Sequence, residues 1–217
     1  VLEFFDEVNK ANVDALSNVI SKYTSENFKM RCTHPFNELS GAEQVANNLW
    51  KPIKDSFSPI QRRMDIFYAG INSHDIKEGK WVSSMGHFMG IFNKEFLGLK
   101  PNLKSILLRY AEFYKVENNK ITEGAIFLDI INLMQQLGVS IIPESTGLVC
   151  VTPGPMNHKG LKFAESNSDE SRKTLNLIHR MRDRLVKGSK MMSFKEELEL
   201  DWHKDMIWWG PGGIGAS

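Results

Sequence analysis

Asp129 is the residue in this sequence whose type and position best suit catalysis. It follows an alternating run over residues 120–128 and begins an apolar run of helical spacing that stops at Gly138. Where a strand meets a helix, a carboxylate can be buried, and burial raises its pKa toward the range that a general acid or base needs. The same position suits a helix N-cap, whose side chain accepts a backbone N–H bond. General acid/base and helix cap are therefore alternative roles for Asp129.

His87 is the second candidate catalytic residue. The alternation over residues 80–92 places it on one face with Trp81, Met85 and Met89. A histidine in this position can donate or relay a proton near neutral pH, or it can be a hydrogen-bonded core residue. If His87 is catalytic, Trp81 contributes to an apolar substrate-binding wall beside it.

Three further polar side chains are candidates for substrate binding. Tyr110 lies on the apolar face of the alternating run 105–116, so we expect its side chain to point inward. His34 and Asn37 flank a Pro-Phe pair and could line a pocket. The alternatives are that His34 only stabilises a loop and that Asn37 is a turn residue that bonds its own backbone.

Metal and cofactor chemistry find no support in the sequence. His34, His74 and His87 lack the short spacing that is typical of metal ligands. A glycine-rich run at residues 210–215 follows no strand and lacks the Lys-Ser/Thr pair of a phosphate-binding loop. We therefore expect neither a metal nor a cofactor.

The charge and cysteine content argue against several classes of partner. The 217 residues include 27 basic and 26 acidic side chains, which gives a net charge of +1. This balance argues against nucleic acid or an anionic membrane as the main partner. No apolar run reaches the roughly 20 residues of a membrane span.

Cys32 and Cys150 lie far apart and are expected to be free thiols, so we expect a cytoplasmic protein.

The hydrophobic periodicity predicts helices, then strands, then one more helix. Helices are expected over residues 12–23 and 41–50, the second opened by a capping box from Ser40 to Glu43, with an irregular stretch over 24–39. Strands are expected over 61–70, 80–92, 105–116 and 120–128, with a hairpin turn at Asn118-Asn119, and a helix over 130–137. Helices grouped against one antiparallel sheet form an α+β fold. We expect a strongly curved sheet that is wrapped by helices and encloses a cone-shaped pocket.

The chain divides into three parts on composition and periodicity. Residues 1–142 form the α+β domain, and 143–169 read as a linker rich in turn-forming and polar residues. Helical spacing returns over 170–217, with a second capping box from Ser193 to Glu196 and a faint repeat of the opening pattern. We expect 170–217 to be the helical start of a second, incomplete domain. About fifty residues cannot bury a core alone, so this part would pack on the first domain or a partner, or the chain lacks part of the protein.

Several of these residues together resemble the SnoaL-like polyketide cyclase family, also called the ester cyclase family, within the nuclear transport factor two-like superfamily. The resemblance covers about residues 10–140. It is carried by His34-Pro35-Phe36-Asn37, Gly86-His87, Phe96-Leu97-Gly98-Leu99-Lys100-Pro101, Lys120-Ile121 with Glu123, and Asp129 before Gln136-Leu137-Gly138. Residues 170–217 resemble the opening of a second such domain.

The resemblance implies a fold, a reaction and roles for particular residues. Members have a hydrophobic cavity between a curved sheet and helices, and the better-known ones close a ring by intramolecular aldol condensation without cofactor or metal. By this resemblance Asp129 is the acid/base, His87 assists it, and Asn37 or His34 lines the pocket. The resemblance implies an apolar small-molecule ligand as partner. A second copy of the chain, bound through the open face of the sheet, is a further expected partner. The alternative is a non-catalytic binding or dimerisation domain of the same fold. This sequence has Ala125 where the family commonly has a Trp, which would reshape the pocket.

Overall fold

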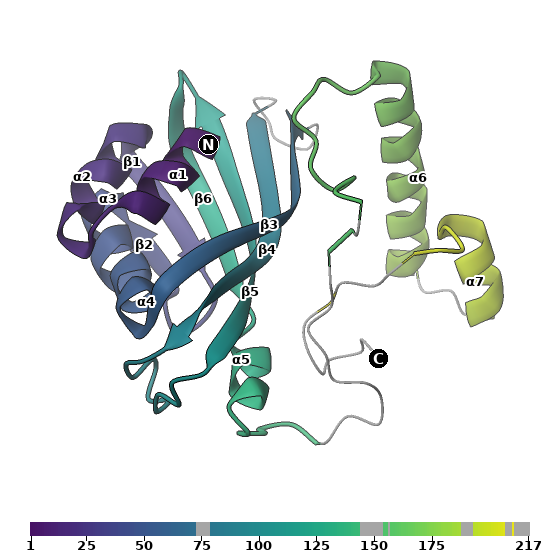
Figure 1. Cartoon of the computed structure of the whole chain (residues 1–217). Coiled ribbons are helices and arrows are strands. Elements are labelled where there is room, and N and C mark those ends of the chain that lie inside the picture. The colour runs from purple at the N-terminus through teal and green to yellow at the C-terminus, as the bar shows by residue number, and fades with distance from the viewer. Residues whose placement is uncertain (73–78, 144–153, 156, 188–192, 207–209, 211–217) are drawn as a thin grey trace. The chain divides into compact units, whose positions relative to one another are not determined.

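A curved, open six-stranded sheet forms the centre of the first part of the chain (Figure 1). The computed structural model describes residues 1–72, 79–143, 154–155, 157–187, 193–206 and 210. The strands are β1 Thr24–Cys32, β2 Glu38–Ser40, β3 Phe57–Ile71, β4 Lys80–Phe92, β5 Ser105–Glu117 and β6 Lys120–Leu128, in the order β2-β1-β6-β5-β4-β3. Neighbouring strands are antiparallel, except that β1 runs parallel to β6. The predicted α+β class is confirmed.

Helices cover one face of this sheet and bury their apolar sides against it (Figure 1). They are α1 Leu2–Lys10, the 3-10 turn η1 Val13–Ala15, α2 Leu16–Tyr23, α3 Gly41–Val45, the π-helical turn η2 Ala46–Trp50 and α4 Lys51–Ser56. The helix α5, Ile130–Gln136, follows β6. Phe4, Phe5 and Val8 of α1 recur at helical spacing and are buried, as an amphipathic helix requires.

Most predicted elements are present, and two local predictions were wrong. Residues 24–39 are not irregular, because β1 and β2 occupy most of that stretch. Only Thr24, Phe28 and Met30 of β1 are buried, so its strand pattern is weak, and pairing with β6 holds it in place. The expected capping box at Ser40 is also absent: the Ser40 side chain makes no capping bond, and its backbone N–H donates to Gln44 Oε1 at 2.9 Å.

The turn predictions are confirmed. Asn118 and Asn119 form the β5–β6 turn with φ of 50° and 61°, a conformation that asparagine tolerates. Gly138, with φ of 77°, follows the end of α5. The capping box at Ser193 and Glu196 is present at the start of α7.

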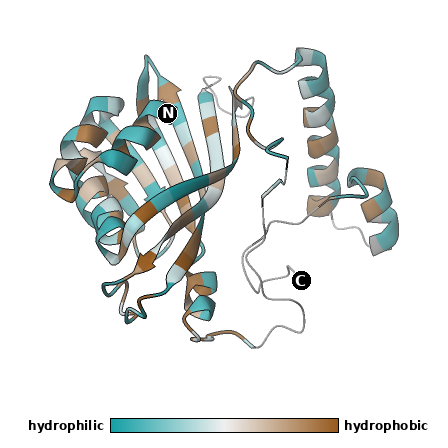
Figure 2. Cartoon of the chain, viewed as in Figure 1, coloured by the Kyte–Doolittle hydropathy of each residue, from teal (hydrophilic) through white to brown (hydrophobic). Residues whose placement is uncertain are grey.

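Residues 164–210 form a separate compact unit, which contains α6, Ser168–Lys187, and α7, Phe194–Asp201. An apolar stripe runs along α6 (Figure 2), and its Leu175, Ile178 and Leu185 are exposed. Arg184 of α6 pairs with the buried carboxylate of Asp201. No helix in the described residues is long and apolar enough to cross a membrane. The division into domains at residues 143 and 170 stays a prediction.

An ion pair between Arg62 and Glu112 lies inside the helix-covered face of the sheet. The Arg62 and Glu112 side chains are 3% and 0% exposed. The Arg62 guanidinium carbon lies 4.1 Å from the ring centre of Phe5, 4.7 Å from that of Phe88 and 5.0 Å from that of Tyr110. The pair thus has an aromatic enclosure, and cation–π attraction adds to the charge–charge attraction.

The charge of Arg62 fixes what its partner must be. A guanidinium does not lose its proton in a protein, so a buried arginine needs an anionic partner. Burial raises the pKa of Glu112, and Arg62 lowers it by less. Burial is the largest influence on the pKa of Arg62 and lowers it, but the charge and hydrogen bond of Glu112 together with Tyr110 and Tyr114 more than offset this and raise the pKa overall. Removal of either member would leave the other as an unpaired buried group.

We predict that Arg62→Met lowers the free energy of unfolding by about 3–5 kcal/mol, because it leaves the buried Glu112 carboxylate without its charge partner. The double variant Arg62→Met/Glu112→Leu should recover most of this loss, because no buried charge remains. Urea unfolding of the two variants and the parent measures the difference. Lys29→Met, which removes an exposed ion pair with Glu38, is the control and should change little. Equal losses in the single and double variants would contradict the account.

Candidate functional site

Asp129 forms the cap of α5. Its Oδ1 accepts a hydrogen bond from the backbone N–H of Asn132 at 3.0 Å. Its own backbone N–H donates to the carbonyl oxygen of Arg109 at 3.0 Å, which joins the end of β6 to β5. The helix-cap alternative is therefore confirmed. One of the two carboxylate oxygens is engaged by the helix backbone, and the acid/base role of Asp129 stays a prediction.

His87 lies on the sheet face opposite α1–α4, where it pairs with Asp65. Its Nδ1 is 3.1 Å from Asp65 Oδ2, and the imidazole is buried, with the residue 5% exposed. Asp65 lies at a β-bulge in β3. Met64 pairs with Gly86 and Ile66 with Met85, so Asp65 is the extra residue between them.

The surroundings of His87 favour its neutral form. Burial is the largest cause that lowers its pKa below the usual 6.5, and the positive charges of Arg109 and Arg63 lower it further. The Asp65 carboxylate acts in the opposite direction by charge and hydrogen bond, but does not offset the burial. A neutral imidazole beside a carboxylate donates its Nδ1–H, so its Nε2 carries the lone pair. This is the tautomer of a histidine base that a carboxylate orients.

A segment far along the chain packs directly on Asp65. Gly160 accepts a hydrogen bond from the Phe67 N–H at 2.9 Å, and the Lys162 N–H donates to the Phe67 carbonyl at 2.7 Å. A Cβ at Gly160 would lie 2.4 Å from the Asp65 carbonyl oxygen, and one at Gly154 would lie 2.4 Å from Asp65 Cβ. Only glycine fits at these two positions. The predicted linker therefore contains residues that hold Asp65 against β4.

Two other predicted site residues, Trp81 and Tyr110, lie on opposite faces of the sheet. Trp81 is half-buried and lies on the same strand face as His87. Tyr110 is buried on the opposite, helix-covered face, where its hydroxyl lies 3.4 Å from Ser84 Oγ and its ring stacks on Phe88 at 4.5 Å. The inward position predicted for Tyr110 is confirmed, but Tyr110 and His87 do not meet.

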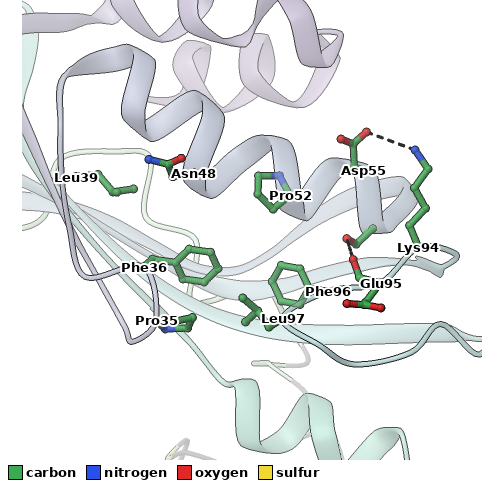
Figure 3. Close-up of a pocket in the computed structure, with 11 residues that line it drawn as sticks. Pro35, Phe36, Leu39, Asn48, Pro52, Asp55, Lys94, Glu95, Phe96 and Leu97 are labelled. Atoms are coloured by element: carbon green, nitrogen blue, oxygen red, sulfur yellow. Dashed lines mark hydrogen bonds and ion pairs between the residues drawn. The ribbon is translucent and has the colours of Figure 1, made fainter.

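His34 and Asn37 are both exposed in the β1–β2 loop. Asn37 has φ of 55°, and its Nδ2 donates to the Pro35 carbonyl at 3.1 Å. The backbone carbonyl of Asn37 accepts a hydrogen bond from the Cys32 N–H at 2.7 Å. The turn-residue alternative is thus confirmed for Asn37. The neighbouring Pro35 and Phe36 line an open hollow of about 580 Å³ between this loop, α4 and the β4–β5 loop (Figure 3).

The described part of the chain contains no cluster of three or more His, Cys, Asp or Glu residues that could hold a metal ion. Burial raises the pKa of Cys32 to about 12, so this free thiol is unreactive at neutral pH. Cys150, His74 and residues 211–215, on which other sequence predictions fall, lie outside the described residues.

The sequence did not single out Asp65, Gly154 or Gly160. The available signal was register: if β3 and β4 are paired, Asp65 falls near His87. A bulge shifts that register by one residue and is not visible in the alternation.

Comparison with known proteins identifies the family. AclR from Streptomyces galilaeus, a proposed hydroxylase, is similar in structure with a TM-score of 0.51 and 16% identity, over 84% of this chain and 93% of AclR. IdmH from Streptomyces antibioticus, a proposed polyketide cyclase, gives a TM-score of 0.51 and 12% identity, over 64% of this chain and 98% of IdmH. At these identities the likeness shows a common fold. A search of curated proteins gave no significant match. The profile of SnoaL-like polyketide cyclases matches residues 1–137, and the chain belongs to this family.

Proposed function

We propose that this protein catalyses cofactor-free proton transfer at carbon in an apolar carbonyl compound, as in an intramolecular aldol cyclisation. His87 is the general acid/base and Asp65 orients it. The observation that carries the proposal is the 3.1 Å contact between His87 Nδ1 and Asp65 Oδ2 on a buried histidine. Membership of the SnoaL-like polyketide cyclase family supports the reaction class.

The proposed step needs one base, and that base also returns the proton. Nε2 of His87 is buried, so a substrate reaches it only when a neighbouring side chain moves aside. Neutral His87 then removes a proton through Nε2 from the carbon next to a carbonyl group, which leaves an enolate and a protonated imidazole. The enolate carbon then bonds to a second carbonyl carbon of the same molecule. The resulting alkoxide takes the proton back from Nε2, so the product is an isomer of the substrate and no co-reactant is consumed.

Positive charge near His87 would stabilise the enolate oxygen. Arg109, which is buried and pairs with His87 across β4 and β5, provides a guanidinium with several N–H donors. The half-buried Trp81, Met85 and Met89 lie on the same face of β4 and supply an apolar wall for the substrate. This combination favours an apolar ketone over a phosphorylated or sugar substrate.

The cap contact of Asp129 favours His87 as the base. One Asp129 oxygen accepts from the backbone of α5, and in the proposed mechanism this residue fixes the junction between β6 and α5. Its backbone bond to Arg109 then holds the strand that carries the enolate-stabilising guanidinium.

Asp65→Asn tests the oriented base. The side-chain amide of this variant can donate to Nδ1 of His87, which moves the proton to Nε2 and removes the basic lone pair. We expect about 10²–10⁴-fold slower deprotonation of carbon. Acetophenone in D₂O, with exchange of its methyl protons followed by NMR, is a suitable probe. Tyr68→Phe, at an exposed position further along β3, is the control and should retain exchange. Exchange by the parent protein no faster than in buffer would contradict the proposal and favour a non-catalytic binding protein.

The pH dependence follows from the lowered pKa of His87. The neutral base predominates above 6.5, so the exchange rate should be constant there and should fall with acid through a midpoint below 6.5. Arg63→Met removes a positive charge that lowers this pKa, so the midpoint should move to higher pH while the plateau stays. Rate measurements from acid to neutral pH check both. An unchanged midpoint in Arg63→Met, or a rate that rises with acid, would argue against His87 as the base.

Asp129→Asn distinguishes the two candidate bases. Asparagine caps helices about as well as aspartate, so unfolding free energy and exchange rate should both stay near the parent values. Asp129→Ala, which removes the cap, should lower stability by about 1 kcal/mol. If Asp129→Asn folds normally but loses exchange, Asp129 is the base and the role proposed for His87 is wrong.

A further inference from the structure

We propose that the hollow between the β1–β2 loop, α4 and the β4–β5 loop binds a small molecule that carries an apolar ring and a protonated amine. The hollow measures about 580 Å³, and Figure 3 shows the residues that line it. This volume is within the range of roughly 300–1,000 Å³ that is typical of small-molecule sites. It shares no residue with the Asp65–His87 pair, so it can be tested independently of the proposed reaction.

Aromatic rings form the apolar surface of the hollow. Phe36 and Phe96 come from different loops and have ring centres 6.2 Å apart. Phe96 is 2% exposed and packs on Phe57 at 4.9 Å, so this surface is anchored in the core. The remaining apolar lining residues are Pro35, Leu39, Pro52 and Leu97. The two phenylalanines and the prolines suit a flat ring rather than a charged or heavily hydroxylated molecule.

Leu97 presents an exposed apolar side chain beside the hollow. It has φ of 53° in a tight turn, in which Phe96 and Leu99 exchange backbone hydrogen bonds of 3.1 and 2.9 Å. Glycine or asparagine adopts this left-handed conformation at lower cost than leucine. The side chain is also 41% exposed. A ligand in the hollow would cover part of this exposed apolar side chain.

The charges at the hollow favour a cation. Asp55 and Lys94 face each other at 3.8 Å and offset one another (Figure 3). Ser56 Oγ donates to the Glu95 carbonyl at 2.9 Å and fixes this residue beside α4. Within the described chain the Glu95 carboxylate has no ion-pair partner, so the lining carries one uncompensated negative charge. An ammonium group near Glu95 would complete the charge balance and could also contact the face of an aromatic ring.

A pair of matched probes tests the class of ligand. Tryptamine and indole-3-propionate share a ring system and differ in the sign of their charge. In titrations of the full chain followed by amide NMR, tryptamine should shift the resonances of Phe36, Phe96 and Leu97 saturably at millimolar concentrations. Indole-3-propionate should bind about tenfold more weakly or not at all. Glu95→Gln should reduce tryptamine affinity about tenfold and remove the preference for the amine.

Leu97→Gly and Leu103→Gly separate binding from backbone effects. Leu103 has φ of 58° and is 73% exposed in the same loop, but does not line the hollow. Both glycine variants relieve a left-handed leucine, so neither should lower the melting temperature. Only Leu97→Gly should weaken tryptamine binding, by about three- to tenfold. Equal or tighter binding of indole-3-propionate, the absence of saturable shifts with tryptamine, or equal effects of the two glycine variants would overturn the proposal.

Discussion

The buried ion pair between Arg62 and Glu112 constrains the helix-covered side of the sheet. Its two charged groups must stay together, because either one alone would be a desolvated, unpaired group. Phe5, Phe88 and Tyr110 pack around the guanidinium and complete the enclosure. The small void beside it, next to Trp50 and Phe88, has a volume of about 10 Å³. A larger hollow of about 580 Å³ lies by Phe36 and Phe96.

Strand alternation assigns the reactive groups to the other face. In β5, Glu112 and Tyr110 point toward the helices, and Arg109 points away. In β4, His87 points to the same side as Arg109. Asp65, the extra residue at the bulge in β3, lies on this side as well, and its carboxylate contacts the imidazole. A register shift of one residue would exchange the two sets of side chains, so the site depends directly on the register of the sheet.

Alternation in the sequence was sufficient for the long strands and for the side of the sheet on which Tyr110 lies. It was not sufficient for β1, whose parallel pairing with β6 joins segments about a hundred residues apart in the chain. Nor did it single out Asp65, since alternation within one strand does not give the pairing of β3 with β4 or the position of the bulge. The two roles of Asp129 could not be separated either, since both require a carboxylate at a strand–helix junction. Only the position of its oxygen beside the Asn132 N–H distinguishes the cap.

The central claim is that Asp65 holds neutral His87 with the proton on Nδ1 and the lone pair on Nε2. Nitrogen-15 NMR of the imidazole rings at neutral pH measures this most directly, because protonated and unprotonated ring nitrogens differ widely in chemical shift. A His87→Gln sample identifies the relevant pair of signals among those of the six histidines. The account predicts a protonated Nδ1 and an unprotonated Nε2 for His87. A proton on Nε2, or on both nitrogens, would contradict it.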